Sequence, residues 1–103
     1  MRIDVQALRE LIFYWIKSDE DLRKHLRDLQ IKLLIERLVK GLSFEEMARI
    51  YDSRPQEVKV IFEAILVKIE NSMSKQVASI LRTVNNYQEG KNQRSDFGRI
   101  FLN

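Results

Sequence analysis

Residues 41 to 60, GLSFEEMARIYDSRPQEVKV, constrain the fold more than any other part of the chain, because they contain two marked helix starts a short turn apart. Ser43 and Glu46 form an S-x-x-E capping box, in which each side chain satisfies a backbone N–H of the other residue. Gly41 is typical of a residue that ends the preceding helix. This segment therefore predicts a helix over residues 44 to about 51.

A second helix is predicted after a turn at residues 52 and 53. Ser53 is its candidate N-cap, Gln56 completes a second capping box, and Pro55 suits the first turn, where its missing N–H needs no partner. The helix extends to about residue 71, so residues 43 to 71 make a helix-turn-helix. The predicted core stripe of this second helix is Val58, Ile61, Phe62, Ile65 and Ile69.

Three other segments carry apolar residues at helical spacing. Residues 5 to 16 predict a first helix. Residues 19 to about 40 predict one long helix, with a break near residue 28 left open. Residues 73 to 87 predict a last amphipathic helix.

The amino-acid composition of the chain also favours an all-helical fold. Three Gly and one Pro are too few for the many turns of an all-β fold, and 45% hydrophobic residues allow one modest core. We expect an all-α fold of four to five helices, with a long N-terminal helical region, the helix-turn-helix, and a C-terminal helix plus tail. The single domain covers residues 1 to 87. Residues 88 to 103 form a tail that is either flexible or docked on a partner.

Several functional classes are disfavoured by the residues present. The chain has no Cys and one His, so it offers no thiolate site and no clustered zinc ligands. It has no Gly-rich phosphate loop and no nucleophile–base set, so we predict no enzyme activity, metal or cofactor. The run LIFYWI is too short to span a membrane. The expected location is cytoplasmic.

The helix-turn-helix segment resembles the DNA-binding domain of LuxR/NarL-type regulators, with region 4 of sigma factors as a near relative. The resemblance covers roughly residues 34 to 81. It implies a four-helix DNA-binding domain, often dimeric through its last helix. It also implies that Lys59 contacts a phosphate or a guanine edge, that Val60 meets a thymine methyl, and that Lys68 lies near the backbone. The matching residues are Gly41, Leu42, Ser43, Glu46, Ala48, Val58, Lys59, Val60, Ile65, Leu66 and Lys68.

The first functional hypothesis is therefore a small bacterial or phage transcriptional regulator that binds double-stranded DNA as a dimer. The net charge of +3 favours an anionic partner weakly. Lys91, Arg94 and Arg99 of the tail would add phosphate contacts. The predicted DNA-facing residues are Arg49, Arg54, Gln56, Lys59, Val60 and Lys68.

A second hypothesis is a helix-turn-helix that binds protein. Glu57 and Glu63 would oppose phosphates, and Val60, Ala64 and Val67 form a second apolar stripe that another helix could cover. A phage or plasmid packaging or replication subunit is a third alternative.

A protein interface is also predicted on either hypothesis. The first helix is apolar over much of its circumference, so either its own core or a partner subunit covers it. The predicted interface residues are Leu11, Phe13, Tyr14, Trp15, Val67, Val77, Leu81, Phe97 and Phe101.

Overall fold

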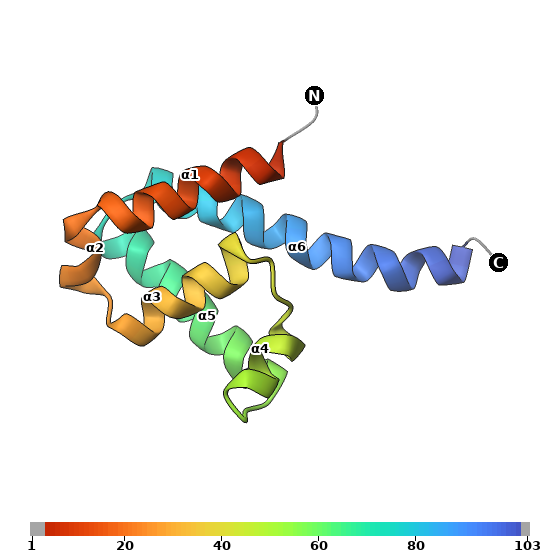
Figure 1. The fold of residues 1–103 in the computed structure, drawn as a ribbon. Helices are drawn as coiled ribbons and strands as arrows, with labels where there is room; N and C mark the ends of the chain where they lie inside the picture. Colours follow the sequence, from red (N-terminus) through yellow and green to blue (C-terminus); the bar gives the residue numbers. More distant parts are fainter. Residues whose placement is uncertain (1–3, 102–103) are drawn as a thin grey trace.

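The computed structural model describes the backbone of residues 4 to 101 and the side chains of residues 4 to 90 (Figure 1). The predicted all-α class is confirmed. In Figure 1, α1 lies along the first part of α6, and α4 lies at the other end of the bundle. Within residues 4 to 101, no helix is both long and apolar enough to cross a membrane. The elements are α1 (Val5–Ser18), α2 (Glu20–His25), α3 (Asp28–Leu34), the π-helix η1 (Ile35–Val39), α4 (Phe44–Ile50), α5 (Pro55–Ser72) and α6 (Lys75–Phe101).

The region predicted as one helix over 19 to 40 is three elements. Leu26 and Arg27 have extended backbone conformations and separate α2 from α3. The Gln30 side chain accepts a 2.9 Å hydrogen bond from the Arg27 N–H and so starts α3. Leu26 is buried. The break, left open near residue 28, therefore turns the chain while keeping an apolar side chain in the core.

The π-helix η1 continues directly from α3 without interruption. Its Lys40 N–H donates to the Ile35 carbonyl oxygen, five residues back, at 2.9 Å. The extra residue in this turn places three consecutive side chains inside the protein: Glu36, Arg37 and Leu38 are all buried. The chain then leaves the helix through Gly41, whose φ of +73° lies in the left-handed region.

The core of the bundle is built around α5, which packs between α4 and α6. The predicted core stripe of α5 is wrong at one position. Ile61 is 50% exposed, and Leu66 is buried instead. Because α5 packs against both α4 and α6, the side of α5 that faces the core lies closer to α6 than helical periodicity alone predicts. The buried residues of α5 are Val58, Phe62, Ile65, Leu66 and Ile69.

The last helix begins as expected but does not end near Tyr87. The Ser74 hydroxyl accepts a 3.2 Å hydrogen bond from the Val77 N–H, and α6 then continues to Phe101. Asn85 and Gln88 are buried although they are polar. Their amides bond groups on other elements, so this polar stretch packs inside the bundle and does not begin a tail at residue 88.

Candidate nucleic-acid interface

The start of the helix-turn-helix is fixed by the capping box that the sequence predicts. The Ser43 N–H donates to the Glu46 carboxylate at 3.1 Å, and the Glu46 N–H donates to the Ser43 hydroxyl at 3.0 Å. The hydrogen bond from the Ser43 backbone lowers the pKa of Glu46 from its usual value. The predicted helix is confirmed, with α4 running from Phe44 to Ile50.

The turn between the two helices closes α4 with a Schellman motif. Asp52 has a φ of +49°, the Ser53 N–H donates to the Ala48 carbonyl oxygen at 2.9 Å, and the Asp52 N–H donates to that of Arg49 at 3.4 Å. The second predicted capping box is wrong. Arg54 is the N-cap of α5, and the Ser53 hydroxyl donates to the Tyr51 carbonyl oxygen. Ser53 is therefore used to end α4.

The Asp52→Gly variant should be more stable than the natural chain by about 0.5–1 kcal/mol, because glycine adopts a left-handed conformation without the penalty of a Cβ atom. Asp52→Val should instead be less stable by roughly 1–2 kcal/mol. Urea unfolding followed by circular dichroism measures both. Equal midpoints for the two variants would contradict the positive φ at this position.

Tyr51 anchors the turn to the π-helix. Its hydroxyl donates a hydrogen bond to the buried Glu36 carboxylate, and the Lys32 ammonium lies 5.7 Å from the centre of its ring. Burial, with a further contribution from Glu36, raises the pKa of Tyr51 to about 12. The phenol thus stays protonated, and the turn is held against the bundle at neutral pH.

A buried arginine holds the entrance to α4 against α6. The Arg37 guanidinium donates to Asn85 at 2.8 Å, to the Leu42 carbonyl oxygen at 3.0 Å and to Glu89 at 3.1 Å. It also lies 3.9 Å from the centre of the Phe44 ring. Burial lowers the pKa of Arg37, and the Glu89 carboxylate partly offsets this effect. The Arg37 side chain therefore joins η1, the start of α4 and α6.

Arg9 makes a second link at the same place. It donates to the Leu38 carbonyl oxygen at 2.6 Å and to Gln88 at 2.7 Å, while the Gln88 amide donates to the Gly41 carbonyl oxygen at 2.7 Å. A Cβ atom on Gly41 would lie 3.4 Å from the Arg9 guanidinium. The loop before α4 is thus held by both α1 and α6, which gives the helix-turn-helix a fixed base.

All six predicted DNA-facing residues are exposed, and Val60 is 60% exposed. Gln56 and Val60 project from the same outward side of α5. Lys59 and Lys68 are nine residues apart, so they lie on opposite flanks of the helix, separated by about 180° in projection and about 13 Å along the axis. The other two, Arg49 and Arg54, lie near the end of α4 and at the N-cap of α5.

Two acidic residues of α5 are paired with α6. The Arg82 guanidinium lies 3.5 Å from the Glu63 carboxylate and 3.4 Å from that of Glu70. These carboxylates therefore occupy the flank toward α6, with their charge partly neutralised. Glu57 is exposed.

The predicted interface residues fall into four groups. Leu11, Tyr14 and Val67 are 54%, 71% and 45% exposed, and Phe13 is 40% exposed. Trp15 and Val77 are half-buried against the core. Leu81 is wrong as an interface residue, because it is buried in the core of this chain beside α5. Phe97 and Phe101 lie outside the residues whose side chains the structure describes.

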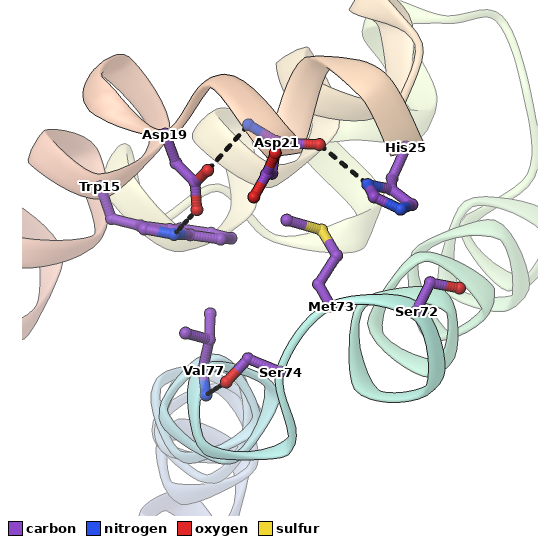
Figure 2. A pocket seen from close by; sticks show the side chains of 8 residues that line it. All are labelled: Trp15, Asp19, Asp21, His25, Ser72, Met73, Ser74 and Val77. Carbon is purple, nitrogen blue, oxygen red and sulfur yellow. Dashed lines mark hydrogen bonds between the residues drawn. The ribbon is translucent and has the colours of Figure 1, made fainter.

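A hollow of about 160 Å³ opens where the junction of α1 and α2 meets the junction of α5 and α6. Figure 2 shows Met73 between the Trp15 indole and the His25 imidazole. Asp19 already accepts from the Trp15 indole N–H at 2.7 Å and from the Asp21 N–H at 2.9 Å. The His25 Nδ1 donates to the Asp21 carbonyl oxygen at 2.9 Å. These groups cap and join helices. In the described part of the chain, no three His, Cys, Asp or Glu side chains gather at metal-binding spacing.

The Arg37 network was missed from the sequence. The available signal was the position of Arg37 within the apolar stripe, three and four residues after Leu34 and Leu33 and directly before Leu38. Comparisons with protein-family models, curated proteins and solved structures each found no match to this chain. Function is therefore inferred from the geometry of the chain itself.

Proposed function

We propose that the protein is a small helix-turn-helix DNA-binding regulator that inserts α5 into the major groove of duplex DNA. The supporting observation is the uncovered outward side of α5, where Gln56, Lys59 and Val60 are exposed beside a tightly capped turn. A helix on this side can enter a groove without any rearrangement of the bundle, because α4 braces it from the other side.

The residues suit different parts of a groove. Gln56 can bond an adenine edge, Lys59 a guanine edge, and Val60 a thymine methyl. Lys59 and Lys68 lie on opposite flanks of α5, so they can also meet phosphates on opposite walls of the groove. Arg54 at the helix start adds a cation where backbone N–H groups favour a phosphate.

Charge pairing weakens one objection to this proposal. Glu63 and Glu70 lie on the same flank of α5 as Lys59, within about 40° in projection, but both are paired with Arg82, which partly neutralises their repulsion of phosphates. Near the turn, the three exposed cations Arg49, Arg54 and Lys59 are balanced by four exposed carboxylates, those of Glu45, Glu46, Asp52 and Glu57. The surface is close to neutral, which predicts modest affinity with a small salt dependence.

The Lys59→Ala variant should bind duplex DNA more weakly, and the slope of log K against log salt should fall by about one, because one cation fewer displaces counterions. Fluorescence anisotropy with a labelled random duplex, repeated at several salt concentrations, measures both quantities. Lys17→Ala is the matched control, since Lys17 is an exposed lysine of α1. Equal effects of the two substitutions would count against groove binding by α5.

Protein binding through the same side of α5 is a second candidate function. Val60, Ile61 and Val67 are 60%, 50% and 45% exposed, and Ala64 between them is exposed as well. Four neighbouring aliphatic side chains on one helix are more than isolated surface residues, and such patches often mark protein contacts. A helix of another protein is the expected kind of partner for this patch.

A further inference from the structure

A single seam of exposed residues runs along α5. Glu57, Ile61, Ala64 and Lys68 are spaced four, three and four residues apart, so they share one face of the helix. All four are exposed, with Ile61 at 50%. The seam has a carboxylate at one end, an ammonium at the other, and apolar side chains between them.

This order is self-complementary when two such helices run antiparallel. The midpoint between positions 57 and 68 is also the midpoint between positions 61 and 64. A two-fold axis there sets Glu57 of one copy against Lys68 of the other, and the large Ile61 against the small Ala64. Isologous dimers require a patch that complements itself in this way. Ala64 also allows the two helix axes to approach closely.

We propose that a second copy of this chain pairs antiparallel along this seam, and that the dimer covers the Lys68 flank of α5, so that the helix cannot enter a groove. Val60 and Val67 lie together on one side of the seam, about 70–90° around the helix from its centre, so pairing covers them in part. Resting on the proposed function, this makes self-association a regulator of that site: the monomer binds DNA and the dimer does not.

Charge exchange tests the register directly. Each of Glu57→Lys and Lys68→Glu places like charges opposite one another at both ends of the seam. Because both pairs change from attraction to repulsion, the dimer dissociation constant should rise roughly tenfold or more. The double variant Glu57→Lys/Lys68→Glu restores both pairs, so its dissociation constant should return close to that of the natural chain. Sedimentation velocity across a concentration series measures these constants.

Glu45→Lys is the matched control, because Glu45 is an exposed acid on α4 and lies off the seam. It should leave the dissociation constant unchanged. Circular dichroism of each variant should match that of the natural chain, since all three positions are on the surface. The antiparallel pairing would be overturned if the natural chain stayed monomeric at every concentration. It would also be overturned if the dimer of the double variant dissociated as readily as the dimers of the single variants.

Adding duplex DNA separates this inference from the proposed function. The natural dimer should convert to a monomer–DNA complex as the duplex is titrated. A dimer that binds DNA intact would overturn the occlusion of α5. Dimerisation without any DNA binding would refute the proposed function and leave the interface standing. DNA binding by a chain that never dimerises would support the proposed function and refute the interface.

Discussion

The Arg37→Ala variant should lose about 3–5 kcal/mol of its free energy of unfolding, because the substitution removes a large, fully buried side chain together with three hydrogen bonds, one of them to the part-exposed Glu89. Arg37 is fully buried, and its guanidinium bonds Asn85, Leu42 and Glu89. Truncation leaves these partners without their donor and opens a hole under Phe44. Because small domains are stable by only about 5–15 kcal/mol, much of the population would unfold on mild heating.

Urea unfolding followed by circular dichroism measures this loss, and Arg82→Ala provides the control. Arg82 also pairs with two carboxylates, but its side chain is 34% exposed and water can replace those contacts. Its removal should cost less than about 1 kcal/mol. Similar losses for the two arginines would mean that the buried network does not hold α4 and α6 together.

The Phe62→Ala variant should also lose about 3–5 kcal/mol, through a cavity at the centre of the bundle. Phe62 is fully buried, and its ring meets that of Phe44 edge-on, with centroids 5.8 Å apart and an interplanar angle of 60°. Phe44 in turn carries the Arg37 guanidinium. This truncation therefore removes the support under the base of the helix-turn-helix. Thermal and urea unfolding provide the measurement.

The neighbouring Ile61→Ala substitution is the control, and it tests whether the Ile61 side chain lies in the core or at the surface. Helical periodicity placed Ile61 in the core, whereas the structure leaves it 50% exposed. Its truncation should cost less than about 1 kcal/mol. If Ile61→Ala destabilises the protein as strongly as Phe62→Ala, α5 is rotated about its axis and turns Ile61 toward the core.

Local signals in the sequence were sufficient for the helix-turn-helix. The capping box at Ser43 and Glu46 and the proline at position 55 determine helix starts through contacts within one turn, so both helices begin within a residue of their predicted positions. The overall all-α class was predictable from spacing and from the small number of Gly and Pro residues.

Tertiary contacts explain the features that the sequence did not predict. The break at Leu26 and Arg27 and the use of Ser53 to end α4 depend on where the chain must turn to pack. Arg37 and Gln88 are polar, and periodicity counts only apolar residues, so their burial was invisible until their partners on other helices were known. For the candidate site, exposure of the outward side of α5 likewise depends on how α6 is placed.

The π-helix makes the length of the chain between α3 and α4 a structural requirement. Deleting one residue from η1 would let the backbone close with ordinary α-helical bonds, which advance each residue by about 100° and do not turn three consecutive side chains toward one core. At least one of Glu36, Arg37 and Leu38 would then lose its buried position, and with it the contacts of Arg37 with α6 or of Glu36 with Tyr51. At this point in the chain, a change in length is more damaging than most changes in residue type.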